Sequence, residues 1–194
     1  QRTRFAALAE AYHGDTIGSV SVGGIDLFHE IYRHMLFDAV RIPCPDHADP
    51  SIEQDCLERA RTLIDKQGHQ LAALIVEPLV QGAAGMRMHS PAFLRTLLQM
   101  ARDAGMLLIV DEVATGLGRT GTLFALEQVG IRPDLMCLAK GISGGYLPLA
   151  LTLATEQIYD AFRGPYTNHR TLFHGHTYTG NALACAAAIA SLDA

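Results

Sequence analysis

Charged side chains stand directly after apolar runs of strand length, and their types could support chemistry on a bound ligand. They are Glu77 after Leu71–Val76, the pair Asp111–Glu112 after Met106–Val110, and Lys140 after Leu135–Ala139. A lysine amine can act as a nucleophile or move a proton. A half-buried carboxylate can hold a cationic partner, such as a protonated ring nitrogen or a metal ion. The pattern therefore indicates a site built around these charges.

Parallel strands would bring these charges together. Continuous apolar runs that alternate with helical segments are typical of strands buried on both faces of a parallel sheet, and such sheets bind ligands at the carboxyl ends of their strands. We therefore predict an α/β fold, with a mostly parallel sheet flanked by helices. The remaining expected elements are helices over Ser51–Gln67, from Ser90–Pro91 to about Ala104, over Thr122–Gln128 and over Asn181–Leu192, and a fourth strand over Leu147–Thr155.

The composition is that of a globular protein and excludes several classes. The sequence has 194 residues, of which 49% are hydrophobic and 18% charged, and a net charge of -5. Basic clusters are absent, so no nucleic-acid partner is expected. No apolar run reaches the roughly 20 residues that cross a bilayer, so no membrane partner is expected. The 4 cysteines lack CxxC spacing, which favours a reduced, cytoplasmic protein, and Cys137 is predicted to be buried.

The two ends of the sequence suggest a larger protein. The chain starts at Gln1 rather than methionine and stops at Ala194 within an apolar helical pattern. We therefore expect residues 1–194 to form one domain that is incomplete at both ends. We also expect the isolated fragment to bind a cofactor weakly and to turn over poorly.

The segment Gly116–Gly121 reads GLGRTG and matches the GxGxxG fingerprint of dinucleotide-binding proteins. Five residues separate it from the preceding strand, and Asp134 starts the next strand rather than ending it, so a nicotinamide-dependent dehydrogenase is a weak alternative. The histidines around His174–Gly175–His176 lack standard zinc spacing, and no metal site is predicted.

Taken in order, these clusters resemble the class III (fold-type I) PLP-dependent aminotransferases. The segments that carry the resemblance are Tyr12–Gly14 (YHG), Glu77–Pro78 (EP), Asp111–Val113 (DEV), Gly116–Gly121 (GLGRTG), Ala139–Gly141 (AKG) and Thr177 before Gly180–Asn181. The match runs from Ala11 to the last residue. It implies the large pyridoxal 5'-phosphate-binding domain of a transaminase.

The resemblance also implies a role for each matching residue. Lys140 would bond covalently to PLP and then move the proton, and Asp111 would pair with the protonated ring nitrogen. Tyr12 and Val113 would pack on the two faces of the ring. Thr177 would reach the cofactor phosphate of a neighbouring subunit, which implies a homodimer with shared active sites.

One branch of this family fits the sequence in more detail. Residues 78–94, the segment Tyr12–Thr16 and Ala114, where several relatives carry glutamine, resemble the biotin-pathway branch, whose members transaminate 8-amino-7-oxononanoate. The resemblance implies that the keto-amine substrate and the amino donor lie near the following residues: Tyr12, Asp15, Arg119, Lys140 and Gly175.

The identity of the amino donor stays open at this stage. Many members that use S-adenosylmethionine read HGPTFMGN, whereas residues 174–181 read HGHTYTGN, as in a lysine-using branch. We expect S-adenosylmethionine first and lysine as the alternative. Another ω-amine transaminase and a non-catalytic ligand-binding domain are the remaining alternatives. The phosphate-binding Gly-Ser turn and the carboxylate-binding arginine of the family are absent from this sequence.

Overall fold

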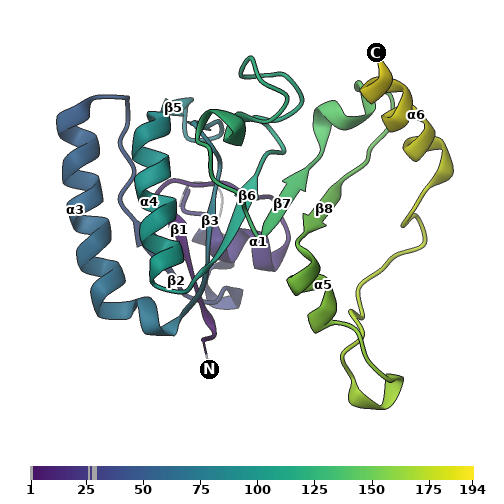
Figure 1. Cartoon of the computed structure of the whole chain (residues 1–194), viewed down its shortest axis with the longest axis horizontal. Helices are drawn as coiled ribbons and strands as arrows, with labels where there is room; N and C mark the ends of the chain where they lie inside the picture. Colours follow the sequence, from purple (N-terminus) through teal and green to yellow (C-terminus); the bar gives the residue numbers. More distant parts are fainter. Residues whose placement is uncertain (1, 26, 28–29) are drawn as a thin grey trace.

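A six-stranded sheet forms the centre of the molecule, with the strand order β2-β1-β3-β6-β7-β8 (Figure 1). The computed structural model describes residues 2–25, 27 and 30–194. Strands β2, β1, β3, β6 and β7 run parallel, and β8 runs antiparallel to β7. Their bounds are β1 Arg4–Leu8, β2 Ala39–Ile42, β3 Leu71–Val76, β6 Leu107–Asp111, β7 Leu135–Leu138 and β8 Leu151–Ala154. The predicted α/β class with a mostly parallel sheet is confirmed.

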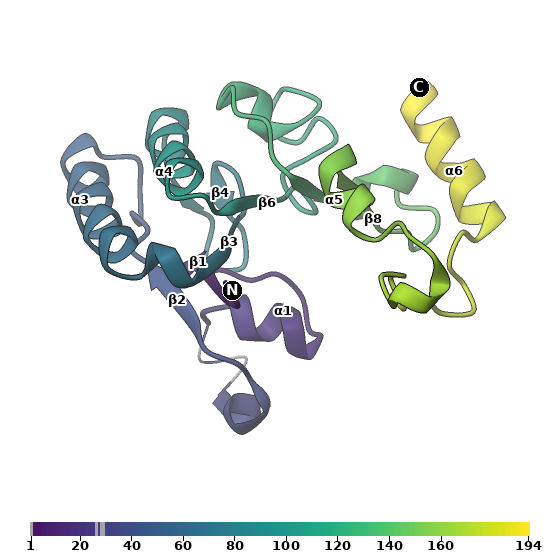
Figure 2. The same cartoon turned by 60° about the horizontal axis from the view of Figure 1, so that its bottom comes forward.

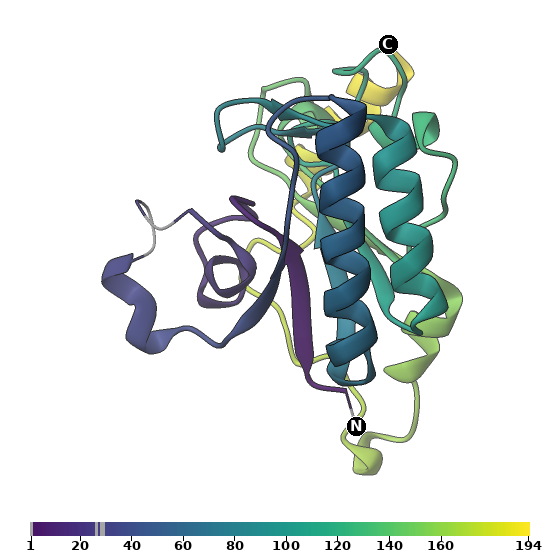
Figure 3. The ribbon, with the colours of Figure 1, turned by 90° about the vertical axis from the view of Figure 1, so that its left-hand side faces the viewer.

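Helices cover both faces of the sheet. Helices α3 (Pro50–Gln67) and α4 (Pro91–Asp103) lie side by side on one face, and α1 (Ile17–Val22) lies on the other (Figures 2 and 3). Helices α5 (Glu156–Ala161) and α6 (Ala182–Asp193) follow β8 along the chain. A small hairpin, β4 (Val80–Gln81) with β5 (Arg87–Met88), and five 3-10 segments complete the described elements: η1 Glu30–Met35, η2 Gly68–Gln70, η3 Ala125–Gln128, η4 Lys140–Ser143 and η5 Tyr166–Asn168.

The N-terminus of α4 is capped by its own sequence and is hydrogen-bonded to α3. Ser90 caps the helix, because its hydroxyl accepts a hydrogen bond from the backbone N–H of Phe93 at 3.0 Å. The buried carboxylate of Glu53, in α3, accepts hydrogen bonds from the backbone N–H and the hydroxyl of Ser90, both at 2.6 Å. The apolar face of α4 packs on the sheet through fully buried leucines, Leu94, Leu97 and Leu98. The Glu53–Ser90 pair therefore ties the two helices together at one end.

Most of the predicted elements are confirmed, with shifts at their ends. The strand over 71–76 and the capped helix after Ser90 form as expected, and the last helix begins after the N-cap Asn181. Two of the expected elements differ in detail. The expected helix over Thr122–Gln128 is a 3-10 turn of four residues, Ala125–Gln128, because Phe124 is still in an extended conformation. The expected strand over Leu147–Thr155 is shorter and pairs antiparallel.

Cys137 is half-buried rather than buried, because β7 is covered less completely than β3 and β6. All four cysteines are free thiols. Among the described residues, the helices are too short or too polar to cross a bilayer.

His89 gives the protein a testable dependence on pH. Its side chain is buried against the ring of Phe93, and burial lowers the pKa of His89 from 6.5 to about 4, against a weaker opposing effect of Glu53. The unfolded chain therefore binds this proton below about pH 6.5, whereas the folded chain binds it only near pH 4. We expect the free energy of unfolding to fall as the pH drops through this window, by on the order of 3 kcal/mol from this group.

Urea unfolding between pH 7 and pH 4 checks this expectation. His89→Gln removes the titrating group and should flatten the pH dependence, whereas His47→Gln should leave it unchanged because the His47 side chain is 62% exposed. An unaltered slope in His89→Gln would show that other groups cause the acid instability.

Candidate active site

The carboxyl edge of the sheet collects polar side chains from four adjacent parallel strands. Tyr12 and His13 follow β1, Glu77 follows β3, Asp111 ends β6, and Lys140 follows β7. Because these four strands run in the same direction, their ends meet at one edge. The structure therefore brings together the strand-end charges that the sequence singled out.

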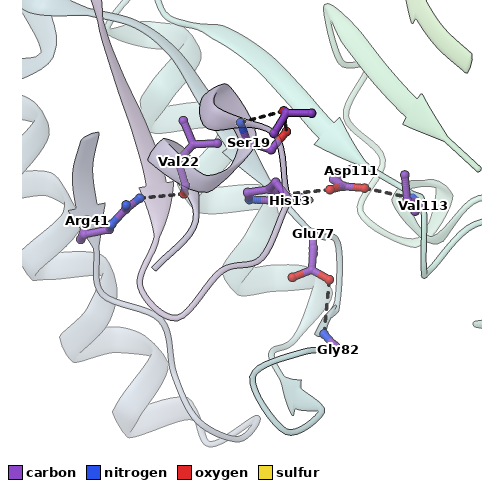
Figure 4. Close-up of polar contacts among 9 residues, drawn as sticks. His13, Ser19, Val22, Arg41, Glu77, Gly82, Asp111 and Val113 are labelled. Atoms are coloured by element: carbon purple, nitrogen blue, oxygen red, sulfur yellow. Dashed lines mark hydrogen bonds and ion pairs between the residues drawn. The ribbon is translucent and has the colours of Figure 1, made fainter. Parts of the chain in front are cut away.

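Asp111 is the centre of the polar contacts at this edge. Its side chain is only 10% exposed, and Oδ2 lies 2.8 Å from Nδ1 of His13, whose side chain is 2% exposed (Figure 4). Its other oxygen, Oδ1, accepts a hydrogen bond from the backbone N–H of Val113 at 3.0 Å. An ionised carboxylate can only accept, so Nδ1 of His13 carries the shared hydrogen. One donor on each oxygen fixes the plane of the carboxylate and leaves further lone pairs for a cationic partner.

His13 is a site residue that sequence reasoning missed. In the sequence it is only the middle residue of the YHG motif. Its contact with Asp111 joins residues that lie 98 positions apart in the chain, so no local pattern could predict it. The signal that was available is Gly14, whose φ of 114° lies in a region that favours glycine and which turns the chain directly after His13.

Tyr12 and Asp15 are paired with each other. The hydroxyl of Tyr12 donates to Oδ2 of Asp15 at 2.9 Å, and this contact raises the pKa of Tyr12 more than burial does. The tyrosine ring is half-buried and Asp15 is exposed. Two of the predicted substrate residues therefore share the short loop after β1, which also carries His13.

Glu77 is a second buried carboxyl group at the same edge (Figure 4). Its Oε1 accepts a hydrogen bond from the backbone N–H of Gly82 at 3.3 Å, and its Oε2 has no partner among the residues that the structure describes. Burial raises the pKa of Glu77, and the neighbouring His13 and the backbone of Gly82 and Tyr12 act in the opposite direction. Glu77 therefore connects the loop after β1 with the hairpin β4–β5.

Glu112 faces away from this edge and has a structural role. Its side chain is completely buried and accepts three hydrogen bonds, from the Thr115 hydroxyl at 2.9 Å and from the backbone N–H groups of Ala125 at 3.1 Å and Leu126 at 2.8 Å. Burial raises the pKa of Glu112 despite these donors. A Cβ at Gly116 would come within 2.8 Å of the Glu112 carbonyl oxygen, which explains the first glycine of GLGRTG. The motif is thus a loop held by Glu112 rather than a phosphate-binding turn.

Replacing Glu112 by glutamine should destabilise the protein by about 1–3 kcal/mol, because the new amide would direct N–H groups at backbone donors in a buried place. The measurement is the urea midpoint of Glu112→Gln at pH 7. The matched control is Glu58→Gln in α3, an exposed position where a change below about 0.5 kcal/mol is expected. Equal midpoints for the two variants would contradict the structural role.

Lys140 lies in a strained turn at the end of β7. Lys140 is exposed to solvent. Its φ of 49° lies in the left-handed region, which non-glycine residues rarely adopt. Gly141 packs against the GLGRTG loop, since a Cβ there would lie 3.3 Å from the Leu117 side chain. Left-handed non-glycine residues also follow β1, β3 and β6, at Glu10, Leu79 and Leu117. Strained backbone conformations concentrate at functional sites. The backbone conformation of this edge therefore indicates a functional site, as its charges do.

Three predicted site residues lie outside this cluster. Arg119 is exposed in the loop after β6, and Gly175 and Thr177 lie in an exposed segment between η5 and α6. That segment makes local contacts, such as the hydrogen bond that the backbone N–H of His176 donates to the Thr179 hydroxyl at 3.1 Å. Over the described ranges, no group of three histidine, cysteine or acidic side chains is arranged to hold a metal ion.

The family assignment follows from comparison with known proteins. A model of the aminotransferase class-III family matches residues 1–194. The chain belongs to the class-III aminotransferases. The resemblance inferred from the motifs is confirmed, and the dehydrogenase alternative is wrong. The GLGRTG loop is followed by the 3-10 segment η3 rather than by the α-helix that a dinucleotide-binding turn requires.

Curated aminotransferases match this chain over its whole length. Adenosylmethionine-8-amino-7-oxononanoate aminotransferase of Nitratidesulfovibrio vulgaris is 56% identical over 200 residues, and the match covers 100% of this chain and 37% of that protein. The enzyme of the same name from Geobacter sulfurreducens is 48% identical, with 100% and 44% covered. The chain therefore spans less than half the length of these relatives.

Solved aminotransferase and transaminase structures share the fold. A crystal structure of adenosylmethionine-8-amino-7-oxononanoate aminotransferase from Methanocaldococcus jannaschii has a TM-score of 0.89 and 41% identity, covering 99% of this chain and 43% of that one. An amine transaminase from an uncultivated Pseudomonas species, in the PLP-bound (internal aldimine) form, has a TM-score of 0.90 and 37% identity, covering 99% and 45%.

The residues of this class-III chain fit the cofactor of the family. A buried carboxylate with one donor on each oxygen, as at Asp111, suits a protonated ring nitrogen. A lysine stands at the end of the adjacent strand, where Asp111 pairs in register with Cys137. Tyr12 supplies an aromatic ring at the same edge. These groups are a nucleophile, a counter-charge and a flat surface, which are what PLP requires of a protein.

Proposed function

We propose that the complete protein containing this chain transfers an amino group to 8-amino-7-oxononanoate to give 7,8-diaminononanoate in biotin biosynthesis. Relatives from eight organisms, between 38% and 56% identical to this chain, carry the name adenosylmethionine-8-amino-7-oxononanoate aminotransferase. The observation that carries the transaminase chemistry is the meeting of Asp111 and Lys140 at the ends of adjacent strands.

When bound, PLP supplies an electron sink for the amine carbon. Lys140 would be the residue that holds the cofactor covalently and moves the proton. Asp111 would pair with the ring nitrogen and hold the proton there. Tyr12 and Val113 would pack against the ring. Support for these roles comes from the two hydrogen bonds to the Asp111 carboxylate and from the exposed Lys140, which follows the adjacent strand in a left-handed backbone conformation.

The substrate and the subunit arrangement are part of this proposal. Tyr12 and Asp15 form one wall of the substrate site, with Arg119 and Gly175 nearby. Thr177 would hold the cofactor phosphate of a partner subunit, and the active form would then be a homodimer. The exposed segment that carries Gly175 and Thr177 supports a position at an interface. Residues 1–194 form the large PLP-binding domain, and the free cysteines support a cytoplasmic location.

The amino donor is S-adenosylmethionine in this proposal, because the names of the relatives include adenosylmethionine. Lysine is the alternative donor, and it is favoured by the sequence HGHTYTGN at residues 174–181. Another ω-amine transaminase is a second candidate function, because the amine transaminase described above matches with a TM-score of 0.90.

The test uses the complete natural protein loaded with PLP, since the chain spans only 37% to 44% of the relatives named above. The protein is given 8-amino-7-oxononanoate with S-adenosylmethionine or with lysine, and the diamino product is measured. Product with either amine supports the proposal and identifies the donor. Turnover of simple amines without any diamino product would favour the ω-amine transaminase instead.

A further inference from the structure

A buried glutamine joins the hairpin β4–β5 to the loop that carries Tyr12. Gln81 lies in β4, and its side chain is completely buried. Its Nε2 donates a hydrogen bond to the backbone carbonyl oxygen of Ala9 at 3.0 Å, across 72 positions of the sequence. Ala9 directly follows β1 and precedes Tyr12 in the same loop. The hairpin therefore contacts the candidate site through a side chain that has no part in the proposed chemistry.

Packing alone does not explain a glutamine at this position. The buried Oε1 of Gln81 has no partner among the residues that the structure describes. A buried polar atom without a hydrogen bond costs stability, whereas a methionine of similar length has no amide to desolvate. The hydrogen bond to the Ala9 carbonyl is thus the feature that distinguishes glutamine from an apolar residue here.

The loop that receives this hydrogen bond is strained. Glu10 has a φ of 60°, in the left-handed region that non-glycine residues rarely adopt. Such a conformation persists only where the surrounding structure holds it. The Gln81 amide holds the carbonyl of Ala9, and therefore the peptide group that joins Ala9 to Glu10.

The other side of this loop is held by the residues that follow α1. The backbone N–H of Gly24 donates to the carbonyl oxygen of Ala11 at 2.7 Å, and a Cβ at Gly24 would lie 2.9 Å from the Glu10 nitrogen. These contacts are made by backbone atoms. On the hairpin side the contact is made by a side chain, so a substitution of Gln81 can release that side of the loop.

We propose that Gln81 is a positioning residue that holds the strained Glu10 turn, and through it the ring of Tyr12, in the orientation used for catalysis. The proposal rests on the proposed function, because it assumes that the Tyr12 ring packs on PLP. Gln81 does not touch the reacting atoms. Without its hydrogen bond, Glu10 can relax towards an ordinary backbone conformation, and the Tyr12 ring then moves relative to Asp111.

The test compares Gln81→Met with Gln81→Glu in the complete protein loaded with PLP. Methionine fills the space of glutamine but donates no hydrogen bond. We expect Gln81→Met to lower kcat/KM for diamine formation by roughly 5- to 30-fold, the range for one lost hydrogen bond in a buried place. It should also shift the absorbance of the bound cofactor. Gln54→Met, at an exposed position in α3, is the control and should behave as the wild type.

Gln81→Glu tests the donor itself. Burial raises the pKa of a carboxyl group above its ordinary value. Below that pKa the carboxylic acid can donate to the Ala9 carbonyl, whereas above it the carboxylate can only accept. The kcat/KM of Gln81→Glu should therefore fall relative to the wild type as the pH rises from about 6 to about 9. At the lower end of this range Gln81→Glu should be more active than Gln81→Met, whereas a role in packing alone would leave the two variants alike.

A double-mutant cycle shows whether Gln81 acts through Tyr12. In a Tyr12→Ala background, Gln81→Met should cause no further loss of kcat/KM. Additive losses, wild-type kinetics in Gln81→Met, or equal activity of the two Gln81 variants at low pH would each overturn this proposal while the wild-type protein still binds PLP and forms the diamine.

The proposal stays testable if Gln81→Met does not fold. The pH profile of Gln81→Glu then decides alone, and a profile parallel to that of the wild type would overturn the role of Gln81. A wild-type protein that binds no PLP would overturn both this proposal and the proposed function.

Discussion

Replacing Lys140 by alanine should remove the visible absorbance band of the lysine-bound cofactor and lower transamination by roughly 10⁴-fold or more, as for other residues on which a covalent mechanism depends. Lys140 is exposed, so the substitution removes little packing and the folded protein should survive. The measurements are the absorbance of the PLP-loaded complete protein before and after borohydride reduction, and its rate of diamine formation.

The sequence offers a matched control for this substitution. The 194 residues contain two lysines, Lys140 and Lys66, and Lys66 lies in the last turn of α3. Lys66→Ala should keep the band and the rate. Borohydride should fix the cofactor on the peptide that contains Lys140. Cofactor found on Lys66, or a band that persists in Lys140→Ala, would show that Lys140 does not anchor the cofactor.

Replacing Asp111 by asparagine should lower kcat by roughly 10²- to 10³-fold, the range for removing one preorganised electrostatic contact from an active site. An amide of the same shape retains an oxygen that can accept from the Val113 N–H, but it has no charge to hold a protonated ring nitrogen. The loss should fall mainly on kcat, because the charge matters most when the ring takes up electrons from the substrate.

Steady-state kinetics and the absorbance of the bound cofactor check this expectation. Asp55→Asn, an exposed position in α3, is the control and should behave as the wild type. A small loss in Asp111→Asn, similar to that of the control, would mean that another group stabilises the ring nitrogen. Glu77 would then be the next residue to replace, since it is the other buried carboxyl group at this edge.

Much of the fold could be predicted from the sequence because its signals are local. The apolar run Leu71–Val76 and the pair Ser90–Pro91 determine a strand and a helix start from a few neighbouring residues, and both formed as expected. The strand at the edge of the sheet was harder to predict from the sequence. Its last strand, β8, is exposed along its length, so burial leaves no clear pattern there. Its antiparallel direction depends on pairing with β7, which no local signal reports.

Some features of the candidate site could likewise be predicted from local signals, and others could not. The charges at strand ends were visible, because a polar residue after an apolar run is a local feature. The sequence could not distinguish the site role of Asp111 from the structural role of Glu112. Adjacent residues in a strand point to opposite sides, and the sequence does not say which side faces the ligand. The partner of Glu112 is a loop 13 and 14 residues later, and that of Asp111 is 98 residues earlier.

The spacing of these residues has a consequence for the timing of folding. The imidazole, the carboxylate and the lysine at the carboxyl edge come from positions 13, 111 and 140, so joining them closes loops of roughly a hundred residues. Contacts of such long range form slowly, after the local helices α3 and α4 can already exist. During synthesis, His13 must therefore wait until β6 has been made before it meets Asp111. A cofactor that needs all three groups would bind only to chains in which the sheet is complete. The cofactor-bound protein would therefore consist of correctly folded chains.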